Sequence, residues 1–68
     1  MPSHVIRRFV YDPDSAHLDV EFVSGRVYRY HQVPQAVAEG MRNAFAKGEF
    51  FNAHIRDRFE FTRLELPG

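Results

Sequence analysis

Apolar and polar residues alternate without interruption over residues 17–22. One set of alternate positions holds Leu18, Val20 and Phe22, and the positions between them are polar. A period of two residues is typical of a strand that has one buried and one solvated face. The pattern therefore predicts a half-buried strand in the first third of the chain.

Two further strands flank this one in the sequence. Residues 5–11 are rich in β-branched and aromatic side chains and predict a preceding strand, and the turn-forming residues 12–15 separate the two. Gly25 predicts a second turn, which leads into a third strand over residues 26–31. We expect these strands, joined by short turns, to pair antiparallel.

The turn at Gly25 leaves two registers open for the third strand. A two-residue loop would place Tyr28 and Tyr30 on the polar face of the hairpin. A three-residue loop, with Gly25 in the left-handed bulge position, would place them opposite Val20 and Leu18 on the apolar face. The second register is favoured because it aligns both rings with the apolar side chains of the neighbouring strand.

Helical spacing replaces alternation after Pro34. A proline suits the first turn of a helix, where a missing N–H costs nothing, and Gly48 suits the end of that helix. The apolar positions at helical spacing are Val37, Met41, Ala44 and Phe45. Gly40 inside this helix is unfavourable by up to about 1 kcal/mol relative to Ala, which indicates a close contact at that position.

The last third of the chain predicts a second helix and a closing strand. Residues 49–57 can form a short helix with Phe51 and Ile55 on one face, and residues 58–66 predict a strand. The element order β-β-β-α-α-β predicts an α+β fold in a single domain over residues 1–68. We expect a small curled antiparallel sheet with one main helix and one short helix packed on one face.

Composition limits both the core and the partners. The 68 residues include seven Phe and three Tyr but no Cys, so the core must rest on aromatic side chains without disulfides. The lack of cysteine fits a reducing compartment, and we expect a cytoplasmic protein. No apolar run approaches the roughly 18 residues of a membrane span, so no membrane association is expected.

The charge balance bears on nucleic-acid binding. Acidic and basic residues number nine each, which counts against strong sequence-independent binding to a polyanion. Eight of the nine basic residues are Arg, which stacks on bases and binds phosphates through two hydrogen bonds better than Lys does. A GC-rich genome would produce the same bias, and this explanation is favoured. Any RNA binding is therefore expected to be weak and local.

Short motifs recur in a fixed order along most of the chain. They include Tyr11-Asp12, Gly25, Tyr28 and Tyr30, Val33-Pro34, Gly48, Phe51-Asn52 and Ile55-Arg56. In this order the chain resembles the KTSC domain family, which is named for the C-terminal region of some lysyl-tRNA synthetases and also occurs as short free-standing bacterial proteins. The resemblance implies RNA binding, the role usually suggested for the family. The family tends to have Tyr where this chain has Phe50, Phe59 and Phe61, so we expect these three rings to act as apolar packing.

Tyr28 and Tyr30 are the first candidates for a binding site. If both were exposed, two tyrosines two residues apart on a strand would form a stacking platform of the kind that RNA-binding sheets use. In the favoured register they are instead core residues whose hydroxyls reach the rim. Arg29 lies between them and is expected to point to the opposite face of the sheet.

A second candidate group lies around the short helix. Asn52 and Arg56 are four residues apart and would share one helix face. Together with Lys47 and Arg58 they could bind a phosphate or a carboxylate. Alternatively, Asn52 braces a turn and Arg56 pairs with an acidic residue of the sheet.

The sequence gives little support for catalysis or metal binding. It has no cysteine nucleophile, no Gly-x-Ser-x-Gly elbow and no glycine-rich phosphate loop. The histidines lack the spacing of a zinc site and are expected to be surface or structural residues: His4, His17, His31 and His54. We therefore expect no catalytic residue, no metal and no cofactor.

Three hypotheses for function follow. The first is a small RNA-binding module, with tRNA as a candidate partner, that acts through arginine–phosphate contacts and tyrosine stacking. The second is a protein-interaction module that uses the exposed sheet face or an edge strand, and the third is a small-molecule or peptide site near Asn52 and Arg56. An edge strand would also allow a weak homodimer, so a monomer or a weak homodimer is expected.

Overall fold

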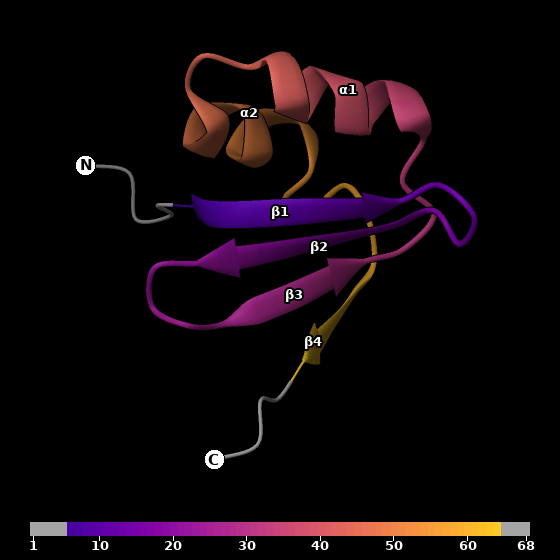
Figure 1. Cartoon of the computed structure of the whole chain (residues 1–68), viewed down its shortest axis with the longest axis horizontal. Coiled ribbons are helices and arrows are strands. Elements are labelled where there is room, and N and C mark those ends of the chain that lie inside the picture. Colours follow the sequence, from indigo (N-terminus) through magenta and orange to yellow (C-terminus); the bar gives the residue numbers. More distant parts are fainter. Residues whose placement is uncertain (1–5, 65–68) are drawn as a thin grey trace.

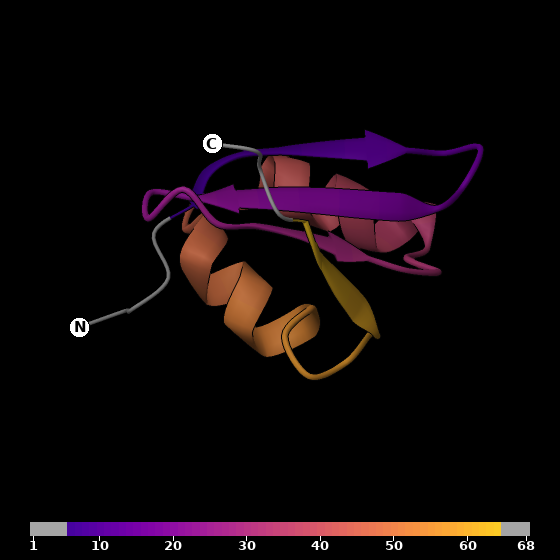
Figure 2. The same cartoon turned by 90° about the horizontal axis from the view of Figure 1, so that it is seen from below.

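The computed structural model describes residues 6–64, which form one antiparallel sheet of four strands and two helices. The elements are β1 Ile6–Asp12, β2 His17–Phe22, β3 Val27–Tyr30, α1 Gln35–Asn43, α2 Lys47–His54 and β4 Phe61–Leu64. The strands lie in the order β1-β2-β3-β4, and both helices pack on one side of the curled sheet (Figures 1 and 2). The predicted α+β fold and its element order are confirmed.

The register of the central hairpin follows the three-residue loop. Tyr30 lies opposite Leu18, and Tyr28 lies opposite Val20. The Gly25 N–H donates a 2.9 Å hydrogen bond to the Phe22 carbonyl, and Gly25 has a φ of 94°, which a side chain would strain. The favoured register is therefore confirmed, and both tyrosines face the helices.

β1 completes the same apolar face. Phe9 lies opposite Val20 and Tyr11 lies opposite Leu18, while the register shifts between Ile6 and Arg8 as in a bulge. The Tyr11 hydroxyl donates a 2.7 Å hydrogen bond to the Val33 carbonyl. This bond ties the edge of the sheet to the segment that leads into α1.

The core lies between this face and the two helices. Its buried members are Leu18, Val20, Phe22, Tyr30, Val33, Met41, Phe51 and Ile55. The first four come from the alternating positions of β2 and β3, as the period-two pattern predicts. Phe51 and Ile55 lie one helical turn apart, so they reach the core together.

The boundaries of the helices differ from the prediction. α1 ends at Asn43, since Ala44 has extended backbone angles, and the Phe45 side chain is fully exposed instead of packing on the core. The Lys47 ammonium donates hydrogen bonds to three carbonyls at this end, those of Met41, Arg42 and Ala44, at 3.2, 3.1 and 3.0 Å. A cation that satisfies the last carbonyls favours an early helix end.

Gly40 marks a close contact, as expected. A Cβ built at this position would lie 2.5 Å from Cζ of Phe50, whose ring packs over α1 from the start of α2. Phe50 and Phe59 pack against the core as partly buried rings. Phe61 departs from the expectation of apolar packing, because 56% of it is exposed.

The segment after α2 also differs from the prediction. The helix ends at His54 instead of continuing to residue 57, and the N–H groups of Ile55 and Arg56 both donate to the Phe51 carbonyl, at 2.9 and 2.8 Å. Asp57 has a φ of 62°, which reverses the chain. The closing strand therefore begins at Phe61 and not at residue 58. Residues 65 and 66, the predicted end of that strand, lie outside the described residues.

Candidate functional site

Within residues 6–64, five aromatic side chains form a closed ring of contacts at one end of the core. The centroid distances are 5.6 Å for Phe22–Tyr28, 5.3 Å for Tyr28–Phe61, 5.6 Å for Phe61–Tyr30, 5.6 Å for Tyr30–Phe51 and 5.4 Å for Phe51–Phe22. All fall in the range of favourable aromatic pairs, and four of the five are edge-to-face. We call this set the aromatic ring cluster.

Sheet register brings these rings together. Tyr28 and Tyr30 occupy alternate positions of β3 and so share one face, and Phe61 at the start of β4 lies opposite Tyr30. Phe22 ends β2 on the same face, and Phe51 reaches down from α2. Four separate elements therefore contribute to one site.

A cavity of about 270 Å³ opens beside the aromatic ring cluster. Its lining is Phe22, Tyr28, Tyr30, Phe51, Arg56, Asp57 and Phe61. Phe22, Tyr30 and Phe51 are buried and form the floor, whereas Phe61 is 56% exposed and stands at the mouth. We call this space the aromatic cavity.

The Tyr30 hydroxyl is a neutral polar group in this cavity. Burial, with smaller contributions from Tyr28 and Asp57, raises the pKa of Tyr30 to about 12, and Arg56 opposes the shift. Among residues 6–64 no group forms a hydrogen bond with this hydroxyl. It remains protonated at neutral pH and can donate a hydrogen bond to a ligand.

Arg56 and Asp57 place opposite charges at the mouth. Both residues are exposed, and neither forms an ion pair within the described part of the chain. The turn after α2 holds their backbone in place, because Arg56 N–H donates to Phe51 and Arg58 N–H donates to Ile55. The alternative in which Arg56 pairs with an acid of the sheet is not what the structure shows.

The sequence candidates separate into two groups. Tyr28, Tyr30 and Arg56 meet at the aromatic cavity. Tyr30 belongs to its floor and is only 4% exposed, so it cannot serve as an open stacking surface. Tyr28 is half-buried and shares the mouth with Phe61.

The other three candidates do not line this cavity. Lys47 caps the end of α1, with its ammonium 5.9 Å from the centroid of the Phe9 ring. Asn52 is exposed on α2, and Arg56 follows the end of that helix, so the predicted shared helix face is wrong. Arg58 lies just beyond Asp57 and lines a neighbouring hollow.

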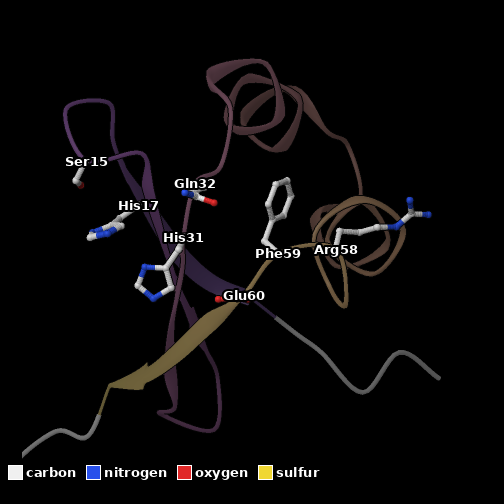
Figure 3. Close-up of a pocket in the computed structure, with 7 residues that line it drawn as sticks. All are labelled: Ser15, His17, His31, Gln32, Arg58, Phe59 and Glu60. Atoms are coloured by element: carbon white, nitrogen blue, oxygen red, sulfur yellow. The ribbon is translucent and has the colours of Figure 1, made fainter.

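That hollow is larger, about 560 Å³, and lies where β2 begins and β3 ends (Figure 3). The His17 and His31 rings meet edge to face with centroids 5.0 Å apart, and His31 Nε2 lies 2.7 Å from the Thr62 hydroxyl oxygen. Figure 3 shows the Arg58 side chain extending away from both histidines. Within residues 6–64 no three His, Cys, Asp or Glu side chains gather in a way that could hold a metal ion.

The opposite face of the sheet carries paired charges. Arg29 forms two hydrogen bonds to the Asp19 carboxylate, 2.9 Å from Nε and 3.1 Å from a terminal nitrogen, and this pairing raises the pKa of Arg29. Arg8 Nε lies 2.7 Å from Glu21, which Arg7 approaches at 3.5 Å. Arginines neutralised in this way are poor candidates for phosphate binding.

Sequence reasoning missed Phe22, Phe61 and Asp57 as site residues. Phe22 was predicted as part of the core, but its place beside Tyr28 depends on the register of the hairpin. Phe61 was expected to be packing, but it lies on the edge strand β4 and is 56% exposed. The presence of Phe where the related family tends to have Tyr was the one sequence signal at that position.

Fold and site together define a small α+β domain with an aromatic cavity flanked by a cation and an anion. The KTSC domain model matches residues 2–59. The chain therefore belongs to the KTSC domain family, and the resemblance in the sequence is confirmed. Within residues 6–64 neither helix is long and apolar enough to cross a membrane.

Similar proteins include both short chains and a much longer enzyme. An uncharacterized protein from Stutzerimonas stutzeri is 40% identical over 66 residues, which cover 96% of this chain and 93% of the relative. The lysine–tRNA ligase of Nostoc punctiforme is 43% identical over 60 residues, but these are 88% of this chain and only 11% of the ligase. This chain thus spans about a tenth of the length of the ligases that it matches.

A solved structure has the same fold. The crystal structure of a KTSC domain protein from Yersinia pestis superposes with a TM-score of 0.84 at 30% identity, covering 96% of this chain and 90% of that one. The fold class is thus shared with a crystal structure of the family.

Proposed function

We propose that this domain is a weak RNA-binding module that holds single-stranded RNA at the aromatic cavity. The observation that carries the proposal is the junction of an exposed Phe61 ring, a half-buried Tyr28 ring and an exposed Arg56 at one opening. Bases stack on exposed aromatic rings, and arginine binds the flanking phosphate. Binding is the role of the site, and no catalytic role is proposed.

The volume of the cavity suits a small apolar group of a ligand. Ligand pockets commonly occupy about 300–1,000 Å³, and this cavity, at about 270 Å³, lies just below that range. One unstacked base fits this description better than a folded surface or a long side chain. The floor supplies ring faces and edges, and the mouth supplies the exposed ring of Phe61.

The charges support local binding instead of a broad phosphate surface. Arg56 is exposed and has no ion pair within residues 6–64, in contrast to Arg8 and Arg29, which pair with carboxylates. With a net charge of zero the domain lacks a general attraction for polyanions. We therefore expect few contacts to phosphates and an affinity for RNA that depends only modestly on salt.

The relatives support RNA as the partner class. A domain of this family forms part of proteins named lysine–tRNA ligase, whose name states that they act on tRNA. Transfer RNA has single-stranded ends and loops, where unstacked bases are available for recognition. We therefore propose tRNA-like RNA as the first partner to test.

The proposal is tested by an NMR titration of isotope-labelled protein with bulk tRNA at low and at moderate salt. We expect amide shifts clustered at residues 28–30 and 55–62 that weaken as salt rises. Scattered small shifts that follow the exposed arginines on every face would contradict the proposal.

A protein-interaction module is the second candidate. The observation in its favour is Phe45, a fully exposed ring in the short connection between α1 and α2, outside the aromatic cavity. Aromatic side chains are enriched in protein–protein interfaces. An apolar contact of this kind would respond little to salt and would be abolished by Phe45→Ala.

A further inference from the structure

RNA binding through Arg56 and the aromatic rings gives no role to the carboxylate of Asp57. This residue lines the aromatic cavity, is exposed and has no ion pair or hydrogen-bond partner for its carboxylate within residues 6–64. A carboxylate repels the phosphates of RNA, so its presence beside Arg56 needs a role of its own. Asp57 also adopts a φ of 62°, which directs the chain back toward β4.

The cavity offers a defined set of hydrogen-bonding groups. An ionised carboxylate only accepts hydrogen bonds, and it has two oxygens side by side. Tyr30 is 96% buried and has a hydroxyl that can donate. A base edge with two neighbouring donors and an acceptor beside them would bond to both carboxylate oxygens and to the hydroxyl at once.

We propose that the aromatic cavity holds a single unpaired guanine of RNA, with Asp57 accepting hydrogen bonds from the base and Arg56 binding an adjacent phosphate. This inference rests on the proposed function and adds the identity of the base. The guanine ring stacks against Phe61 and Tyr28 at the mouth. Its N1–H and N2–H groups face the carboxylate, and O6 faces the Tyr30 hydroxyl.

The other three bases match the cavity less well. Adenine and cytosine each present one exocyclic amine next to a ring nitrogen that accepts, and this acceptor would face the carboxylate. Uracil presents one N–H between two carbonyl groups. Among the four bases only guanine places two donors next to each other on its Watson–Crick edge, which is the edge that single-stranded RNA exposes.

The position of Arg56 agrees with this orientation. Arg56 precedes Asp57 directly, and both residues line the cavity without forming an ion pair with each other. The guanidinium can thus bind the phosphate of the nucleotide, while the carboxylate accepts hydrogen bonds from the edge of its base. Guanidinium binds phosphate oxygens in pairs, which would orient the nucleotide.

The test compares four uridine-rich RNA octamers that differ only in one central base, G, A, C or U. Their affinities are measured by fluorescence anisotropy at low salt with the full chain. We expect the G octamer to bind roughly 5- to 150-fold more tightly than the other three, the range typical of a two-point contact to a base edge. Guanosine monophosphate retains the base and one phosphate, so it should compete with the G octamer, and it should bind more weakly because it lacks the neighbouring nucleotides.

Asp57→Asn is the decisive variant. Asn tolerates a positive φ as well as Asp does, so the turn is conserved while one acceptor becomes a donor. We expect the preference for G to disappear, with the affinity for the other octamers unchanged or slightly higher. Asp14→Asn is the matched control, since it removes one exposed carboxylate in the β1–β2 turn, away from the cavity, and should keep the preference.

The possible outcomes separate the two proposals. Equal binding of all four octamers, weakened alike by Arg56→Ala, would overturn the guanine assignment and leave RNA binding in place. A preference for G that survives Asp57→Asn would also overturn it. If no octamer binds, RNA binding itself fails. Amide spectra of each variant establish that it is folded.

Discussion

Phe61 lies opposite Tyr30 across the β3–β4 pair, yet Phe61 is 56% exposed and Tyr30 only 4%. Their ring centroids are 5.6 Å apart. The buried ring therefore supports the exposed one from below, and the pair forms one wall of the aromatic cavity. An exposed ring held in this way is ordered before a ligand arrives, which lowers the entropic cost of stacking.

Replacing the exposed ring should affect binding more than folding. We expect Phe61→Ala to weaken binding of single-stranded RNA by about 1–3 kcal/mol, the contribution of one stacked base. The loss of stability should be small, because most of the side chain is already in solvent. Phe45→Ala removes an equally large exposed ring outside the cavity and should leave RNA affinity unchanged. Equal losses from both variants would contradict a role for the cavity.

The contact between Gly40 and Phe50 makes a clear prediction for stability. Gly40→Ala adds a Cβ at 2.5 Å from a ring carbon, so the ring must move. Overpacking typically costs about 1–3 kcal/mol, which exceeds the gain of about 1 kcal/mol from better helix propensity. We expect urea unfolding to show a net loss of stability of up to about 2 kcal/mol.

A second substitution identifies the cause of that loss. Phe50→Leu shortens the side chain over Gly40 and should make the added methyl group tolerable. In the Phe50→Leu background, Gly40→Ala should therefore be neutral or stabilising. If the loss is the same in both backgrounds, the contact does not cause it.

Lys47 should contribute to the stability of the fold and not to the affinity for RNA. Lys47→Met keeps an unbranched apolar side chain. It removes the three hydrogen bonds to the end of α1 and the ammonium that lies 5.9 Å from the centroid of the Phe9 ring. We expect the free energy of unfolding to fall by about 1–2 kcal/mol, with unchanged RNA affinity for the folded protein. Arg26→Met, an exposed change with no ion pair lost within residues 6–64, serves as the control for loss of charge.

Tyr30 should make the fold sensitive to alkaline pH. Its pKa in the folded chain is about 12, mainly through burial, and an unfolded tyrosine titrates near 10. Since the folded state holds the proton more tightly, the contribution of Tyr30 to stability is constant below about pH 10 and falls as pH rises from about 10 to 12. Tyr30→Phe should flatten this part of the stability profile. An unchanged profile in that variant would show that another group is responsible.

The hydrogen bonds of the Asp12 carboxylate in the β1–β2 turn should make the stability of the fold depend on pH in the acidic range. Hydrogen bonds from the Ser15 hydroxyl and from the Asp14 N–H, at 3.0 Å each, lower the pKa of Asp12. A depressed pKa means that the ionised turn is stabilising above the unfolded pKa and that this contribution is lost as pH falls through the folded value. Ser15→Ala should raise the pKa of Asp12, measured by NMR titration of its carboxyl carbon. No change would contradict the role of the hydroxyl.

The local pattern of residues was sufficient to predict the sheet. Alternation along β2 sets Leu18 and Val20 on one face, and Gly25 fixes the loop length that brings Tyr28 and Tyr30 opposite them. Both signals lie within a few residues of each other. For this reason the hairpin register and the element order could be predicted.

The exposure of Phe45 and the place of Asp57 in the site could not be predicted, because both depend on contacts outside the local sequence pattern. Phe45 continues the helical spacing of α1 but is exposed, because α1 ends early at carbonyls that Lys47 satisfies. Asp57 became a site residue only through the turn after α2, which places it beside rings from β3 and β4. Neither arrangement has a periodic signal in the sequence.

If the domain binds RNA as proposed, RNA bases must contact the rings of the aromatic cavity. The most direct measurement is an isotope-filtered NOE experiment on protein labelled at Phe and Tyr, bound to an unlabelled uridine-rich octamer with one central guanine. We expect NOEs from the ring protons of Phe61 and Tyr28 to base and ribose protons, and none from Phe45. NOEs confined to Phe45, or amide shifts without any ring-to-base NOE, would contradict the claim.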